Sequence, residues 1–238
     1  MNFQQINIKE QYEEKIIGIW KAYKSLPELN QVGFEYRKYP TSPLSVKKGG
    51  ILFIGINPSY TIKDGTLPKE TIEFYSDPSL IQPDIQYFAK FKEIVDYCNS
   101  YVWCHLDLLF IRETDQNVIK GLTNHKQCVD FINAQLIISF EIINNLQPDI
   151  IVVTNALATE FFGKKKKIHF DKFDKIWLGH DLDFEKDFDE VIGTYKIPIS
   201  NRETPIIFSG MLSGQRALDN GSFERLKWQI KRILTMNK

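Results

Sequence analysis

The chain has 238 residues, with 30 basic and 30 acidic side chains and a formal net charge of zero. This balance excludes a strongly basic nucleic-acid-binding surface, so any binding to DNA must depend on local patches. The three cysteines, Cys98, Cys104 and Cys128, are scattered and form no Cys-x-x-Cys pair, which argues against a disulfide scaffold or a metal cluster. We therefore expect no metal and no cofactor.

The first residues, MNFQQINIKEQYEEK, lack the apolar core of a secretory signal. No apolar run in the sequence is long enough to cross a bilayer. We expect a cytoplasmic protein that acts as a monomer and does not contact a membrane.

An amphipathic helix is predicted over residues 9 to 26, where apolar side chains such as Ile16 and Trp20 recur at helical spacing. Residues 1–48 are interpreted as a helical extension that packs onto the rest of the chain. Together they are expected to form a single domain over residues 1–238.

The sequence ILFIGINPSY, from Ile51 to Tyr60, begins with an apolar run that is typical of a strand buried on both faces of a parallel sheet. Gly55 is expected to let the backbone turn, and Pro58 stops the strand. Asn57 is then left at the carboxyl end of a buried strand, which is where ligands bind in open α/β sheets. The alternative is an Asn that caps its own turn.

Two adjacent aromatic residues, Phe74 and Tyr75, follow in the sequence EFYSDPS. They are either exposed for a ligand or folded back onto the core. A helix is predicted from Tyr87 to Cys98.

A second strand is predicted over YVWCHLDLLF, from Tyr101 to Phe110. Strand alternation places Trp103, His105 and Asp107 on one face. A buried His and Asp are unfavourable unless they meet each other, a ligand or water. A hydrogen-bonded pair with a structural role is the alternative.

A long helix is predicted from Lys126 to Leu146, followed by a third strand at Asp149–Thr154. Asn155 stands at the carboxyl end of that strand and is either a ligand contact or the N-cap of the next helix. The four lysines at 164–167 form a solvated loop or a phosphate contact. Residues 169–190 are interpreted as an insertion without an assigned place.

An edge strand is predicted at Ile192–Ile199 and a last inner strand at Pro205–Phe208, with a closing helix from about Ser222 to Met236. The fold class is therefore α/β, a three-layer α/β/α sandwich with a mainly parallel central sheet of four strands. Those strands are Ile51–Ile54, Tyr101–Leu109, Asp149–Thr154 and Pro205–Phe208.

Three segments together resemble the uracil-DNA glycosylase superfamily, over roughly residues 50 to 235. GINPS at Gly55–Ser59 is similar to the water-positioning motif, in the Gly-x-Asn-Pro form of the mismatch-specific branch. SGMLSGQR at Ser209–Arg216 is similar to the DNA-intercalating loop, and QPDIIVVTNALATEFFG at Gln147–Gly163 to the strand between them.

The resemblance implies base excision from DNA and assigns a role to each motif. Asn57 would position the attacking water, and Phe74 or Tyr75 would stack on the flipped base. The base edge would be read by His105, Asp107 or the backbone near Ile56, with Asn155 as a weaker candidate. The remaining substrate contacts would be Gly55, Pro58 and Ser59.

The loop after the last inner strand would bind DNA, and Leu212, with Met211 beside it, would fill the vacated base stack. The alternative is that both side chains fold under as a latch for the closing helix. The other residues predicted to bind DNA are Ser209, Gly210, Ser213 and Arg216.

Two departures from the family pattern bear on activity. Phe208 and Ser209 stand where many members have a His that stabilises the uracil anion, and an Asn cannot take up a proton as a carboxylate can. His105 is proposed to replace the missing group. The alternative function is a catalytically silent nucleic-acid or nucleotide binder. A small-molecule α/β hydrolase is disfavoured because no Gly-x-Ser-x-Gly elbow is present.

Overall fold

The computed structural model describes residues 3–31, 39–59, 72–80, 86–163, 179–214 and 217–236. The helices are α1 (Ile8–Tyr23), α2 (Pro27–Gln31), the short 3₁₀ helix η3 (Gln86–Phe88), α3 (Ala89–Tyr97), α4 (Gln116–Leu122), α5 (Lys126–Leu146), α6 (Ala156–Phe162), α8 (Phe184–Asp187) and α9 (Asn220–Met236). The strands are β1 (Gln5–Asn7), β2 (Thr41–Pro43), β3 (Ser45–Lys47), β4 (Ile51–Gly55), β5 (Glu73–Tyr75), β6 (Trp103–Asp107), β7 (Ile150–Val153), β8 (Phe188–Asp189), β9 (Thr194–Ile199) and β10 (Arg202–Phe208). Across these ranges, no helix combines the length and the apolar character that a membrane span requires.

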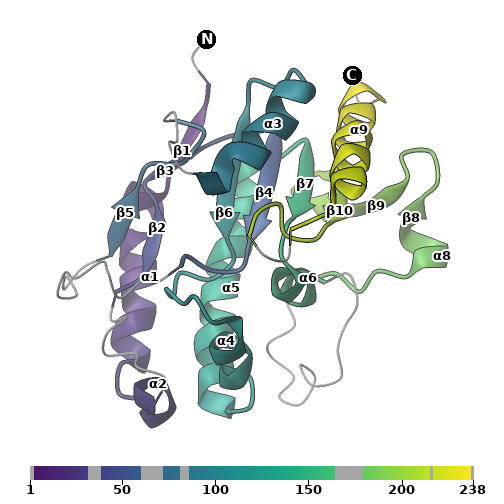
Figure 1. Ribbon diagram of the computed structural model, residues 1–238. Coiled ribbons are helices and arrows are strands. Elements are labelled where there is room, and N and C mark those ends of the chain that lie inside the picture. Colours follow the sequence, from purple (N-terminus) through teal and green to yellow (C-terminus); the bar gives the residue numbers. More distant parts are fainter. Residues whose placement is uncertain are drawn as a thin grey trace.

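The centre of the molecule is a six-stranded mixed sheet with the order β6-β4-β7-β10-β9-β8 (Figure 1). The four strands predicted from the sequence are its parallel part, and they are adjacent to one another. The sheet is larger than predicted, because β9 adds antiparallel to β10 and β8 then adds antiparallel to β9. The predicted edge strand, β9, is therefore covered on its outer side by β8, a strand of two residues.

Helices cover both faces of this sheet, because alternate side chains of each buried strand point to opposite faces. Leu52 and Ile54 belong to a core that includes α1, α5 and α6. Ile51 and Phe53 belong to a second core formed with α3 and α9. All five residues of β4 are buried, which explains why its sequence is a continuous apolar run. The structure is thus an α/β fold with helices on each side.

The N-terminal helix α1 packs against α5, as Figure 1 shows on the left of the molecule. Trp20 contacts Phe131 edge to face, with 5.2 Å between ring centroids. Asn145 donates a hydrogen bond to the Tyr12 hydroxyl at 2.7 Å. The predicted helix is confirmed, although it ends at Tyr23, and α2 follows from Pro27.

The order of the strands indicates where a ligand would bind. This is the edge of the sheet formed by the carboxyl ends of its parallel strands. From β4 the chain moves to β6 on one side, whereas from β7 it moves to β10 on the other side. Ligands in open α/β sheets bind at the carboxyl ends of strands where the direction reverses in this way. In Figure 1 the arrows of β4 and β6 point downwards to this edge.

Candidate functional site

Asn57 follows β4 at this edge and is held by the loop after β6. Its Nδ2 donates hydrogen bonds to the carbonyls of Glu113, at 2.6 Å, and Pro58, at 3.0 Å. The Glu113 amide in turn donates to the Pro58 carbonyl at 2.9 Å. Within the described part of the chain, both hydrogen bonds of the Asn57 side chain come from Nδ2, so that Oδ1 remains available as an acceptor. The alternative role, capping its own turn, accounts for only one of these two bonds.

Gly55 has a different role from the one predicted. It is the last residue of β4 and pairs with Asp107, and its backbone does not adopt a positive φ. A Cβ atom at this position would overlap Asp107 Oδ1 and would lie 3.1 Å from His105 Nε2. Glycine is therefore required here because the side chains of the neighbouring strand occupy the space, and the chain turns only after it.

His105 lies on the face of β6 that α3 covers, as strand alternation predicts. The residue is 4% exposed, and the rings of Phe88 and Phe91 lie 5.3 and 5.6 Å from it. Within the described residues neither ring nitrogen has a hydrogen-bond partner. Burial lowers the pKa of His105 to about 4, so the imidazole is neutral at physiological pH.

Asp107, two residues further along β6, is partly exposed and lies near enough to the Tyr75 and Tyr87 hydroxyls to affect their ionisation. Burial raises the pKa of its carboxyl group to about 7. Burial is the main cause of the raised pKa of Tyr75 and of Tyr87, and the negative charge of Asp107 is the second cause. The pKa of Tyr87 is raised to about 12. No hydrogen bond or ion pair reaches Asp107 from any other described residue. The predicted alternative of a bonded His–Asp pair is thus not what the structure contains.

Asp77 is a component of this region that the sequence reasoning missed. Its buried carboxylate accepts hydrogen bonds from the backbone amides of Ser79, at 2.8 Å, and His105, at 3.1 Å. Because β6 is the edge strand of the sheet, its His105 amide would otherwise lack a partner. Asp77 therefore fixes β6 beside the site. The Asp-Pro-Ser sequence, which is typical of a side-chain-bonded turn, was the available signal.

The two aromatic candidates point in different directions, because β5 places consecutive side chains on opposite faces. Phe74 packs against the core next to α1, with Lys9 Nζ 5.8 Å from its ring centre. Tyr75 lies closer to the site, because the charges of Asp107 and Asp77 help to raise the pKa of its hydroxyl. Tyr75 is consequently the better candidate for a stacking partner, together with Tyr87, which was not predicted.

Asn155 is the N-cap of α6. Its Oδ1 accepts hydrogen bonds from the amides of Leu157, at 2.9 Å, and Ala158, at 3.2 Å. This is the helix-capping role that was the alternative to a ligand contact. The Ile56 carbonyl is likewise occupied, since it accepts from the Leu109 amide at 2.8 Å. Pro58 and Ser59 lie beside Asn57, and Ser59 is exposed.

The loop after β10 differs from an exposed wedge. Leu212 is 4% exposed and belongs to the core formed with α9, so this conformation corresponds to the latch alternative and not to an exposed wedge. Burial of an apolar side chain against Phe223 and Leu226 provides the physical reason. Met211 and Ser213 remain partly exposed. Arg216 and the four lysines at 164–167 lie outside the described residues.

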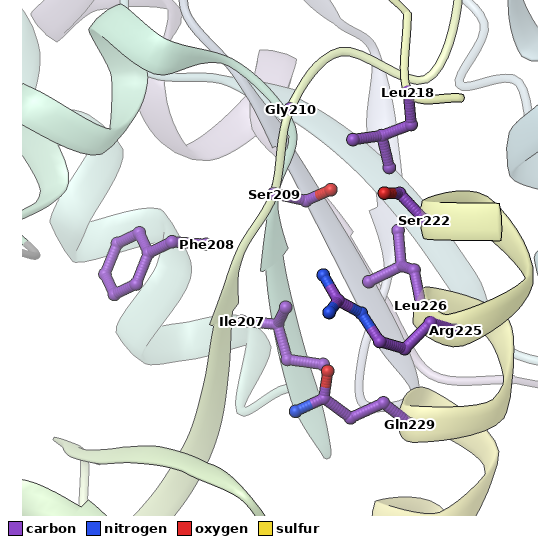
Figure 2. A pocket seen from close by; sticks show the side chains of 9 residues that line it. All are labelled: Ile207, Phe208, Ser209, Gly210, Leu218, Ser222, Arg225, Leu226 and Gln229. Carbon is purple, nitrogen blue, oxygen red and sulfur yellow. The ribbon is translucent and has the colours of Figure 1, made fainter. Parts of the chain in front are cut away.

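Ser209 and Gly210 line a cavity of about 150 Å³ between β10 and α9. In Figure 2 the Ser209 and Ser222 hydroxyls lie on opposite sides of this cavity, and Arg225 extends from α9 towards β10. Arg225 has no ion pair with any of the described residues. The cavity can therefore hold an anion such as a phosphate group. Arg225 was missed because it occurs in an ordinary amphipathic helix pattern.

Across the described ranges, no three His, Cys, Asp or Glu side chains converge as metal ligands, including those around His105. Comparison of the sequence with protein-family models gives no match, and comparison with curated proteins finds no significant relative. The functional interpretation therefore depends on the geometry of the site.

Proposed function

We propose that the protein hydrolyses the N-glycosidic bond of uracil or a related damaged or mismatched base in DNA. The observation that supports this most strongly is a set of polar groups without partners at one edge of the sheet. Asn57 Oδ1 is available at the end of β4, and the His105 imidazole and the Asp107 carboxyl group lie at the end of β6. Of these three residues, His105 is buried and Asn57 and Asp107 are partly exposed, and a buried polar group without a partner calls for an explanation such as a ligand.

The proposed mechanism assigns the attacking water to Asn57. An amide oxygen accepts a hydrogen bond from water and so orients it, but cannot remove its proton. The bonds from Nδ2 to Glu113 and Pro58 keep Oδ1 in a fixed position, and a fixed position is what makes such a residue effective. The water would attack the anomeric carbon as the bond to the base breaks, the bonding electron pair would leave with the base, and the proton lost by the water would pass to solvent or to the departing base.

The flipped base would lie over the residues at the end of β6, with Tyr75 or Tyr87 against its face. Neutral His105 can donate a hydrogen bond to a base that leaves as an anion, which would compensate for the missing His after β10. Arg225 and the Ser209 hydroxyl would hold a phosphate of the strand in the neighbouring cavity.

The test is base release from oligonucleotides that carry uracil, hypoxanthine or a mismatched thymine. Asn57→Ala should slow release about 100-fold or more while DNA binding, measured by fluorescence anisotropy, changes little. The matched control is Asn201→Ala, in the exposed turn between β9 and β10, at the opposite end of β10. Release by Asn57→Ala at the rate of the control would refute the assignment.

One observation favours a second function, a nucleic-acid binder without catalysis. The burial of Leu212 removes the apolar group that would replace an extruded base in this conformation. A silent binder predicts tight binding of the same oligonucleotides without base release, even over long incubations. The same assay therefore separates the two functions.

A further inference from the structure

The Asp107 carboxyl group lies in the site without a hydrogen-bond partner among the described residues. Gly55, on the neighbouring strand, leaves the space that this carboxyl occupies. Across the described residues it has neither a hydrogen bond nor an ion pair, and its charge affects the nearby Tyr75 and Tyr87 hydroxyls. The side chain is only partly exposed at the carboxyl end of β6, so a ligand that binds there would meet a carboxyl group that no described residue engages.

We propose that Asp107 is the specificity-determining residue of the site, and that it reads the edge of a pyrimidine base as a neutral carboxylic acid. This inference rests on the proposed function, because it assumes that a flipped base occupies the site. The neutral acid has one donor and one acceptor, whereas the carboxylate has two acceptors only. It therefore pairs with an edge that offers one acceptor and one donor.

Uracil and cytosine each present one acceptor beside one donor, but the positions of the donor and the acceptor are exchanged between the two bases. Uracil offers the O4 acceptor beside the N3–H donor, and cytosine offers the N3 acceptor beside the amino donor. The proton of a carboxylic acid can reside on either oxygen, so Asp107 can pair with both bases. The carboxylate would keep only one hydrogen bond to either base, and its second oxygen would face an acceptor. The proposed ligand is thus a pyrimidine base that carries either a keto group or an amino group on C4.

Among the described residues, none supplies Asp107 with a positive charge that would keep it ionised. The titratable groups that face it are Tyr75 from β5, Tyr87 from η3 and the neutral His105 from its own strand. Asp77, after β5, is a further acid and directs its oxygens to backbone amides. Burial accordingly raises the pKa of Asp107 to about 7, which makes the neutral form available near physiological pH.

The test uses short single-stranded oligonucleotides with one 2′-fluoro-deoxyuridine or 2′-fluoro-deoxycytidine, whose glycosidic bonds resist hydrolysis. The same strand with an abasic site is the reference. We expect the parent protein to bind both base-containing strands more tightly than the reference at pH 5.5. This preference should fall about tenfold per pH unit above pH 7. Asp107→Asn, which keeps a donor and an acceptor at every pH, should show a preference that does not change with pH.

Three results would overturn the inference: a preference of the parent that is independent of pH, an Asp107→Asn variant that follows the parent curve, or strong rejection of one of the two bases. Base release from ordinary deoxyuridine strands is measured in parallel. Release without the pH-dependent preference refutes only the role of Asp107. The pH-dependent preference without any release supports that role and refutes the hydrolytic function.

Discussion

Replacement of Asp107 by Asn should change how stability depends on pH, whether or not the protein is an enzyme. The pKa of this carboxyl group is about 7 in the folded protein, against an ordinary value of 3.8. The folded state therefore holds the proton more tightly than the unfolded state. The stability due to this group is fully present below pH 3.8 and is lost as the pH rises through 7. At about 1.4 kcal/mol per pKa unit, the loss is on the order of 4 kcal/mol.

His105 has the opposite effect and partly hides this loss in the parent protein. Its pKa is about 4 in the folded protein, below the ordinary 6.5, so stability is lost as the pH falls from 6.5 towards 4. Between these values the two residues change the free energy of unfolding in opposite directions. A nearly flat pH profile of the parent in this range would therefore conceal both contributions.

The measurement is the free energy of unfolding in urea at pH 4, 6 and 8 for the parent and for Asp107→Asn. Relative to the parent, the variant should gain about 4 kcal/mol between pH 4 and pH 8. Asp181→Asn, which removes an exposed carboxylate by the same Asp-to-Asn change, is the matched control. A constant difference for Asp107→Asn would mean that folding does not change the pKa of this carboxyl group, and would refute the prediction.

Two further predictions concern the aromatic pair and the loop after β10. Phe74→Ala should lower stability and leave binding of the base unchanged, whereas Tyr75→Ala should weaken base binding; equal effects on binding would contradict the assignment of Tyr75. Leu212→Ala should destabilise the protein by about 2–5 kcal/mol, because the side chain is buried, and should leave the ratio of activities on duplex and single-stranded DNA unchanged. A melting temperature equal to that of the parent, with a selective loss on duplex DNA, would restore the wedge assignment.

The elements that the sequence predicts well are those with strong apolar patterns. The helix Lys126–Leu146 has the predicted bounds, and the strand at Ile51 is buried along its whole length. The pairs β1–β3 and β2–β5 and the two-residue β8 were not predicted. Strands of two or three residues are too short to show a period, so only tertiary contacts define them.

The site was predictable where its residues follow buried strands. Strand alternation correctly placed His105 and Asp107 on one face, and the apolar run before Asn57 identified the end of β4. The role of Gly55 depends on register, since its partner across the sheet is Asp107. The burial of Leu212 depends on how the loop meets α9, and such packing leaves no local signal.

The neutral form of Asp107, which no positive charge from the described residues opposes, would link recognition of the base to its departure. An ionised Asp107 would repel a base that leaves as an anion, whereas the neutral acid would donate a hydrogen bond to it. On the proposed mechanism the same proton is therefore needed for binding and for release, and activity should decline above pH 7 for both reasons. Asn57 contributes no ionisable group that would oppose this decline. A decline that appears in the rate of release, but not in binding of the 2′-fluoro strands, would assign the proton to departure of the base alone.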